Sequence, residues 1–389
     1  MGGRADGLSR GEPGARALKR PGRLPITTVM HRERRHRLGA LAAAFATAAY
    51  TAWLALGVGG EASVLYMADL GTVLAALVAT ALCLRAAGGQ VRGLRRFWLL
   101  LAAACGAWTV GEAVWAVYDL VLEMEVPVPS LADVGYLAGI PLAVAALLSH
   151  PAMRGGGGRR TPALIDGLAI ATALLFLSWT FVLGPLWEST DLTTAGGLVA
   201  LAYPFGDVVI FFFILLVIRR MTRDGRLALW WLLAGLLALA LADSTYAYLV
   251  EVSAYQGGTL LDSGWVAGYL AIAVGALCSD SRGGVAPRAK PALGLAPVLA
   301  AFLPMLAALT VVGIQIELGQ RPDRAALVMA FALVVISLVR QVLLVLELIA
   351  PHDERDGGVV MRLYAALRGG TLEDRAVPPS PLSPERSAL

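Results

Sequence analysis

The stretch of residues 130–150, SLADVGYLAGIPLAVAALLSH, decides the class of fold. After Asp133 it contains no Lys, Arg, Asp or Glu, and nearly all of its side chains are apolar or small. A helix rises about 1.5 Å per residue, so a helix of this length crosses a hydrocarbon core roughly 30 Å thick. A lone strand would leave its backbone groups without hydrogen bonds in lipid. The stretch therefore predicts a transmembrane helix.

Similar apolar segments occur along the whole chain of 389 residues. The chain is 58% hydrophobic and 15% charged, whereas about 25% of the residues of a soluble domain are charged. These values exclude a water-soluble protein. We expect an all-α integral membrane protein with about ten transmembrane helices arranged as five helical hairpins. The predicted helices cover residues 38–58, 64–87, 95–118, 131–150, 163–187, 195–219, 227–251, 261–279, 293–316 and 324–349.

Charged residues alternate between the loops on the two sides of these helices. Arginines and lysines fill the leader, the even-numbered loops and the C-terminal tail, whereas acids dominate the odd-numbered loops. Only the last odd-numbered loop carries arginines, Arg321 and Arg324. Positive charge marks the cytoplasmic side, so we expect a multi-pass cell-membrane protein with both termini in the cytoplasm. The same topology explains the net charge of +4, and we expect no nucleic-acid partner. The predicted regions are a basic disordered leader (1–37), a polytopic membrane domain (38–350) and a short, largely disordered cytoplasmic tail (351–389).

An aspartate recurs near the start of every second apolar segment, which is the main evidence for the five hairpins. The recurring residues are Asp69, Asp133, Asp207, Asp262 and Asp323. An aspartate at a helix start accepts hydrogen bonds from unpaired backbone N–H groups and faces the positive end of the helix dipole. We therefore interpret Asp69, Asp133, Asp262 and Asp323 as helix caps.

Small residues follow three of these aspartates at a constant spacing. Small residues four positions apart allow two helices to approach closely. We interpret two pairs of glycines as packing positions rather than ligand contacts. These pairs are Gly135 with Gly139, and Gly264 with Gly268.

Three further acids lie inside predicted spans, where an unpaired carboxylate is costly and indicates function. They are Glu112, Asp207 and Asp243. Helical spacing places aromatic side chains beside them. The candidate ligand-binding residues are Glu112, Trp115, Asp119, Tyr203, Asp207, Asp243 and Tyr246.

Most of the tyrosines and tryptophans belong to the outer half of the predicted membrane domain. An aromatic belt at the lipid interface is one explanation, but a belt forms at both interfaces. The alternative is an outward-facing cavity lined by acids and aromatic rings. Such a lining suits a cation or an amine, through charge and cation–π contacts.

Motifs of catalysis and of cofactor or metal binding are absent from the sequence. It has no Walker loop, GxSxG, HExxH or Rossmann glycine pattern. We expect no enzymatic activity, no cofactor and no metal site. The cysteines, Cys83, Cys105 and Cys278, have no CxxC spacing and are expected to pack as small apolar residues. The histidines, His31, His36, His150 and His352, are expected at the cytoplasmic surface.

One basic residue, Arg340, lies inside the last predicted span. Its side chain can snorkel to the inner headgroups, or it can pair with Glu347 on the same face of the helix. Asp166, at the cytoplasmic start of the fifth predicted helix, is interpreted as a cap. The last helix is where a signal would leave the bilayer.

Three stretches together resemble the multi-pass sensory region of actinobacterial GGDEF and GGDEF–EAL proteins. They are PSLADVGYLAGIPLAVAAL (129–147), AYPFGDVVIFFFILLV (202–217), and the pair LADSTYAYL (241–249) and LLDSGWVAGYLAIAVGAL (260–277). The resemblance covers about residues 40–350 and implies a sensory or regulatory membrane module. No GGDEF or EAL motif occurs, so the cyclic-di-GMP chemistry of those proteins is not carried over.

We therefore expect a sensory or regulatory module in the lipid bilayer that binds a ligand in its outer half. The last helix and the tail would signal to a cytoplasmic partner protein. A secondary transporter of a small cation or amine is the alternative, since repeats, buried acids and interrupted helices also suit alternating access. The oligomeric state stays open, with a homodimer as one alternative.

Overall fold

The computed structural model describes residues 26–154, 160–191, 193–221, 226–251, 255–279 and 302–349, and every regular element within them is helical. Among these residues, eight helices are long and apolar enough to cross a membrane. Two shorter apolar helices, Asp262–Leu277 and Met305–Glu317, accompany them in the described part of the chain. The prediction of an all-α integral membrane architecture is confirmed at this level.

The elements follow the predicted segments closely. They are α1 (Ile26–Leu56), α2 (Gly60–Ala87), α3 (Arg92–Ala116), η1 (Val117–Val121), α4 (Leu131–Ser149), α5 (Pro151–Arg154), α6 (Arg160–Ser178), η2 (Trp179–Leu183), α7 (Gly184–Ser189), α8 (Ala195–Arg220), α9 (Arg226–Glu251), α10 (Asp262–Leu277), α12 (Leu303–Glu317) and α13 (Arg324–Ile349). The elements η1 and η2 are single π-helical turns.

Two predicted boundaries differ from the structure or extend beyond it. Helix α1 begins at Ile26, inside the leader that we expected to be disordered up to residue 37. The first part of the predicted ninth span, 293–301, lies outside the described residues, as does the tail from residue 350. The apolar run within α1 begins only at Leu38, after a basic stretch. Hydropathy therefore located only the later part of this helix.

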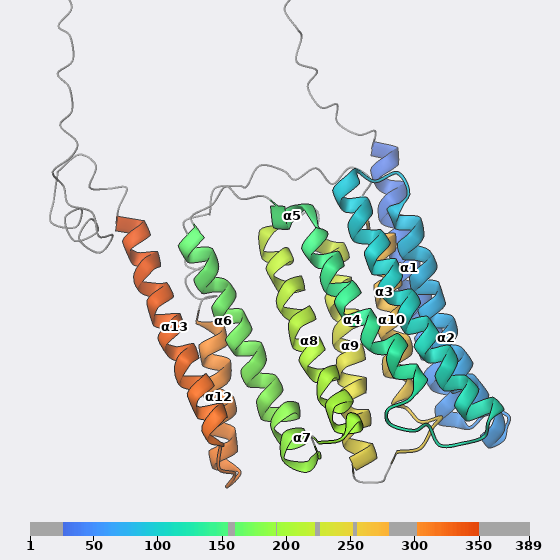
Figure 1. Ribbon diagram of the computed structural model, residues 1–389. Helices are drawn as coiled ribbons and strands as arrows, with labels where there is room; N and C mark the ends of the chain where they lie inside the picture. The colour runs from blue at the N-terminus through green and yellow to red at the C-terminus, as the bar shows by residue number, and fades with distance from the viewer. Residues whose placement is uncertain are drawn as a thin grey trace, which may run out of the picture.

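Six helices form a closed ring. Helix α2 packs on α3, α3 on α4, α4 on α8, α8 on α9, α9 on α10, and α10 returns to α2. Outside the ring, α1 packs against α10 and α2, while α6 packs against α8 and carries α12 and α13 on its far side. Figure 1 shows α1 and α2 at one edge of the molecule and α13 at the other.

The described chain enters and leaves at the same end of the bundle. Helix α1 begins and α13 ends at the top of Figure 1, while the turns into α2, α4, α8, α10 and α13 lie at the bottom. We call the bottom the turn end. The aspartates that head α4, α10 and α13 therefore share this end of the bundle.

Glycines allow the closest helix contacts in the ring. A Cβ atom added at Gly135 would lie 2.7 Å from the carbonyl oxygen of Ala107 and 2.9 Å from Cα of Gly111, so α4 contacts the backbone of α3. A Cβ atom at Gly139 would meet the indole ring of Trp108. Such contacts leave no room for a larger residue.

Helices α9 and α10 meet in the same way. A Cβ atom at Gly264 would lie 2.9 Å from Cβ of Ala242. At Gly268 it would lie 2.7 Å from Leu239 and 2.9 Å from the carbonyl oxygen of Gly235. Both pairs of predicted packing glycines thus lie at helix interfaces.

Three of the recurring aspartates stabilise the start of a helix. Asp133 forms a capping box with Ser130, whose backbone nitrogen donates to Oδ2 at 2.6 Å. Asp262 accepts from the backbone nitrogen of Thr259 at 2.7 Å, and Asp323 from that of Ala326 at 2.7 Å.

Asp69 does not cap a helix, which corrects our interpretation of it. Helix α2 begins at Gly60, and its first turn contains Glu61 instead. Asp69 therefore lies well inside the helix, where the backbone N–H groups are already paired. The hydropathy of residues 64–87 marks the apolar part of α2 but hides its polar first turn.

Candidate functional site

The ring encloses a cavity of about 440 Å³ toward the turn end. Side chains of α2, α3, α4, α8, α9 and α10 line it, together with Val182 of η2, Leu186 of α7 and residues of the loops before α4, α8 and α10. A volume of this order accommodates a small organic molecule. Because loop residues belong to the lining, the cavity reaches the turn end of the bundle.

The lining is acidic and aromatic. Six carboxylates face the cavity: Asp69, Glu112, Asp133, Asp207, Asp243 and Asp262. Eight aromatic side chains accompany them: Trp108, Trp115, Tyr136, Tyr203, Tyr246, Tyr255, Trp265 and Tyr269. None of the described lining residues is Lys, Arg or His. The cavity therefore presents several carboxyl groups and no basic side chain in its described lining.

Glu112 is held by tyrosines from two neighbouring helices. The hydroxyl of Tyr269 on α10 donates to Oε1 at 2.8 Å, and the hydroxyl of Tyr136 on α4 donates to Oε2 at 3.1 Å. Charged or polar groups inside a membrane domain are stabilised by such hydrogen bonds. The triad fixes the carboxylate of Glu112 between α3, α4 and α10.

Two more carboxylates join neighbouring helices of the ring. Tyr203 on α8 donates a short hydrogen bond to Oδ1 of Asp133 on α4. The indole nitrogen of Trp265 on α10 donates to Oδ1 of Asp243 on α9 at 2.7 Å. Asp133 thus lines the cavity as well as capping α4, a second role that its position in the sequence did not indicate.

Asp207 on α8 and Asp69 on α2 differ from the other four acids. Among the described residues, no donor forms a hydrogen bond to Asp207, and its charge interacts with that of Asp243. Oδ2 of Asp69 is buried without a hydrogen-bond partner, and Asp69 interacts with the carboxyl group of Asp119 in η1. Each therefore lies near a second acid rather than near a donor.

The aromatic rings contact one another around the cavity. Tyr246 contacts three rings edge-on, with centroid distances of 5.8 Å to Trp115, 4.7 Å to Tyr255 and 6.1 Å to Trp265. Tyr255 lies in the loop before α10, and burial beside Asp262 raises the pKa of its hydroxyl, which stays a hydrogen-bond donor. These contacts hold the ring faces and edges in fixed positions.

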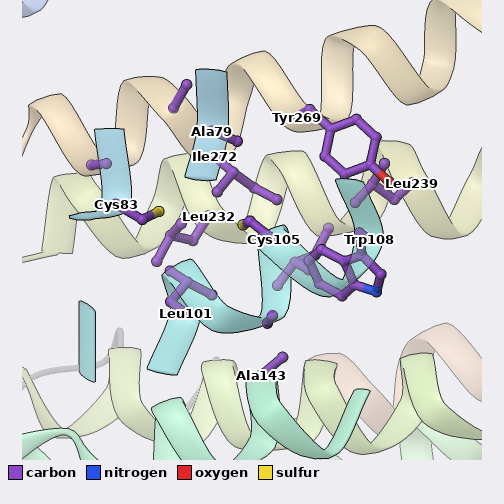
Figure 2. Close-up of a cluster of buried hydrophobic side chains, with 14 of the residues drawn as sticks. Ala79, Cys83, Leu101, Cys105, Trp108, Ala143, Leu232, Leu239, Tyr269 and Ile272 are labelled. Atoms are coloured by element: carbon purple, nitrogen blue, oxygen red, sulfur yellow. The ribbon is translucent and has the colours of Figure 1, made fainter. Parts of the chain in front are cut away.

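The end of the cavity away from the turn end is closed by apolar packing. Trp108, Leu239 and Tyr269 form its floor, and beyond them come Leu101, Leu232 and Ile272 (Figure 2). Leu101 is 3%, Leu232 1% and Ile272 0% exposed, so this half of the ring holds no water-filled path.

The cysteines belong to this apolar half, as predicted for small packing residues. Cys83 on α2 and Cys105 on α3 lie within the buried cluster around Leu232 and Ile272 (Figure 2). Cys278 is also buried. None of the three cysteines is a lining residue of the cavity.

Most of the predicted ligand-binding residues come together in the cavity. Glu112, Trp115, Tyr203, Asp207, Asp243 and Tyr246 all line it. Asp119 does not, because the π-helical turn η1 interrupts the regular helical spacing that placed it on the face of Glu112. That these residues bind a ligand stays a prediction.

Sequence reasoning missed Asp69, Asp133 and Asp262 as cavity residues. Their recurrence near helix starts favoured a capping role for all three. The packing of α2 on α3 and α10 determines which face of α2 borders the cavity, and the sequence of α2 alone does not encode that packing.

Within the residues that the structure describes, no group of three or more His, Cys, Asp or Glu side chains is arranged to hold a metal ion. Each of the six cavity acids instead comes from a different helix of the ring. The geometry suits a ligand of several atoms better than a single ion.

Comparisons with known proteins add no relative. No protein-family model matches the chain, no curated protein matches it, and no solved structure matches it.

Proposed function

We propose that the chain is a membrane-embedded sensory or regulatory module whose ligand is a small organic cation. One observation supports this most strongly: an acidic and aromatic cavity with no basic residue in its described lining and an apolar cluster at its floor. Carboxylates neutralise a positive ligand, and aromatic rings attract it through cation–π contacts.

We further propose ten spans in five hairpins, with both termini in the cytoplasm. At the end where α1 begins and α13 ends, α3 and α9 begin with Arg92 and Arg226, and α8 ends with Arg219 and Arg220. The described turns at the opposite end carry mostly acids, with Arg321 and Arg324 at the turn into α13 as the exception. The positive-inside rule then orients the turn end, and with it the cavity, toward the outside of the cell membrane.

Sensing is favoured over transport by the apolar floor of the cavity. A transporter alternates access to both sides around a central site. Here the half of the ring beyond Trp108 and Tyr269 is packed with apolar side chains that lack polar groups for a permeating cation. The π-helical turns and the prolines inside α4 and α8 support the transporter alternative, because they are points where helices bend.

An ion-pair network provides a route from the cavity to the last helix. Asp166 on α6 accepts from Nε of Arg340 on α13 at 2.6 Å and from Nη2 of Arg219 on α8 at 3.1 Å. Helix α8 also carries Asp207 and Tyr203 of the cavity. A ligand that shifts α8 would therefore alter the contacts of α13, and α13 would pass the change to a cytoplasmic signalling protein.

The experiment uses the full chain reconstituted in lipid nanodiscs, with spin labels on Leu168→Cys of α6 and Val342→Cys of α13. Both positions are exposed, and the described native cysteines are buried. We expect n-butylamine or 1,4-diaminobutane to change the distance distribution between the labels in double electron–electron resonance. Glu112→Gln should abolish the change, and the exposed Glu61→Gln should retain it.

A flux measurement decides between the two functions. Proteoliposomes containing the chain should bind radiolabelled amine without accumulating it in the lumen. Saturable uptake would establish a transporter and contradict the sensory function. Absence of binding by either amine would contradict the organic-cation ligand altogether.

A further inference from the structure

Two acids of the cavity receive no hydrogen bond from a tyrosine, tryptophan or backbone donor of the described residues, and they lie on opposite walls. In the ring, α3 and α4 separate α2 from α8 on one side, and α10 and α9 separate them on the other. Figure 1 shows these four helices between α8 and α2. Asp69 and Asp207, which line one continuous cavity, therefore face it from opposite sides.

The other four acids are already engaged by the protein. Tyrosine, tryptophan or backbone donors bind Glu112, Asp133, Asp243 and Asp262. These donors offset part of the cost of burying each carboxylate. Asp69 and Asp207 receive none of these donors: the side chain of Asp69 interacts with the carboxyl group of Asp119, and that of Asp207 with the carboxyl group of Asp243. A cationic ligand would supply both a donor and an opposite charge at each place.

Each unpaired acid also has a second carboxyl group beside it. Asp243 neighbours Asp207, and Asp119 neighbours Asp69. Two carboxylates close together attract a cation more strongly than one does, and an ammonium group has three donors with which to join them. The cavity thus contains two separate sites for positive charge, with Glu112 and aromatic rings between them.

We propose that the ligand is a linear diamine or polyamine that spans the cavity from Asp207 to Asp69. One ammonium group binds between Asp207 and Asp243, near the rings of Tyr246 and Trp265. The other binds at Asp69 beside Asp119. The alkyl chain lies along the aromatic lining between the two sites, which suits its apolar surface. This inference rests on the proposed organic-cation function and specifies the ligand within it.

Titration calorimetry on the wild-type chain in nanodiscs tests the requirement for two charges. The probes are 1,4-diaminobutane, spermidine, n-butylamine and 1,4-butanediol. We expect the two polyamines to bind at least about tenfold more tightly than n-butylamine, since each ammonium–carboxylate contact adds a charge-assisted hydrogen bond. The uncharged diol should not bind.

A series of α,ω-diaminoalkanes tests the distance between the sites. A cavity with two fixed sites should give one chain length of highest affinity and weaker binding for shorter and longer members. Affinity that rises steadily with chain length would show simple partitioning and overturn the two-site proposal.

Single substitutions assign the two sites. Asp69→Asn and Asp207→Asn should each reduce the affinity for the best diamine to about that of a monoamine, roughly tenfold or more. Glu61→Gln, which removes one negative charge from the exposed start of α2, is the matched control and should leave the affinity unchanged. Size-exclusion profiles and thermal unfolding establish that each variant is folded.

The outcomes separate this inference from the proposed function. Equal affinity for n-butylamine and every diamine would overturn the two-site ligand while leaving an organic-cation module in place. Unchanged diamine affinity in folded Asp69→Asn or Asp207→Asn would do the same. If no amine binds the wild-type chain, both proposals fail. The wild-type comparison needs no substitution, so it remains decisive even if a variant does not fold.

Discussion

Asp133 performs two structural roles with one side chain. Its Oδ2 atom completes the capping box at the start of α4, and its Oδ1 atom accepts from Tyr203 of α8 at the cavity wall. The first role follows from its neighbours in sequence, and we could predict it. The second depends on the packing of α4 against α8, which no local pattern in residues 130–140 encodes.

The same distinction holds for the acids of the cavity. The cost of a charge in lipid identified Glu112, Asp207 and Asp243 from the sequence alone. Their partners Tyr136, Tyr269 and Trp265 come from other helices and were not predicted. Sequence patterns thus identify the residues that need partners, whereas tertiary packing decides which partner each residue receives.

Gly135 should not tolerate a methyl group. In Gly135→Ala the new Cβ atom would lie 2.7 Å from the backbone oxygen of Ala107, so α3 and α4 must separate. We expect a loss of about 1–3 kcal/mol in the free energy of unfolding, as for other overpacked sites. Thermal unfolding in detergent provides the measurement.

The matched control is Gly106→Ala on α3. Its Cβ atom would meet only Thr80 Cγ2, at the ordinary distance of 3.7 Å. Alanine favours the helix over glycine, so this variant should be neutral or slightly more stable. If the two variants were equally stable, the contact between α3 and α4 would be looser in solution than in the structure.

His150 corrects an expectation and gives a pH dependence. We predicted a surface residue, but its side chain is only 4% exposed, and it packs edge-on against Phe97 with ring centroids 5.0 Å apart. Its Nδ1 accepts from the backbone nitrogen of Ala152 at 3.2 Å. Burial lowers the pKa of His150 from 6.5 to about 4.

The sign of the effect follows from proton binding. Between pH 6.5 and pH 4 the unfolded chain binds a proton at His150 and the folded chain does not, so acidification favours unfolding. We expect the stability contribution of His150 to be complete above pH 6.5 and to fall by about 2 kcal/mol on reaching pH 5. The measurement compares thermal unfolding at pH 7.5 and pH 5 in wild type and His150→Gln. A steeper pH dependence in the variant would contradict the prediction.

At the scale of helices, Arg340 shows how an element is attached. We expected its side chain to snorkel or to pair with Glu347, whose side chain lies outside the described part. The structure pairs it with Asp166 instead, which we had interpreted as a helix cap. Arg340 is 15% and Asp166 23% exposed. Spacing within one helix could not reveal this pair, because the two residues belong to α13 and α6.

Removing Asp166 should loosen α13 from the bundle. Asp166→Asn leaves the largely buried guanidinium of Arg340 without a counter-charge, and breaking a buried pair costs about 3–5 kcal/mol. Since the pair is partly exposed, we expect a loss of about 2 kcal/mol. Thermal unfolding of the single variants and of the double variant Asp166→Asn/Arg340→Met measures the effect.

The double variant also reports on the mechanism. Arg340→Met removes the charge that lacks a partner, so it should restore part of the stability lost in Asp166→Asn. Additive losses would mean that the two side chains do not interact. Arg219→Met, whose residue is 52% exposed, is the milder control, and we expect it to change stability by under about 1 kcal/mol.

For the whole molecule, the sequence predicted the helices better than their arrangement. Hydropathy located the long helices because lipid requires apolar segments of a minimum length. The closure of the ring by α10 on α2 joins segments almost two hundred residues apart, roughly the separation of Asp69 and Asp262. Neither charge alternation nor the aspartate repeat contains this information.

The orientation in the membrane is the prediction at this scale. Glu123 lies in the exposed loop between η1 and α4 at the turn end, and Arg92 begins α3 at the opposite end. In intact cells, a membrane-impermeant maleimide should label Glu123→Cys and not Arg92→Cys. After permeabilisation both should react, while the described native cysteines stay buried. The reverse labelling pattern would invert the topology and place the cavity on the cytoplasmic side.

The closed ring also has a consequence for biosynthesis. A ribosome delivers α2 and α3, with Asp69 and Glu112, long before α8, α9 and α10 exist. During that interval Glu112 lacks Tyr269, and both carboxylates border lipid instead of a cavity, an arrangement that bilayers strongly disfavour. Nascent helices must therefore wait beside the translocon, or beside an insertase, until α10 is synthesised. Chains released before that point should be preferred substrates of membrane proteases.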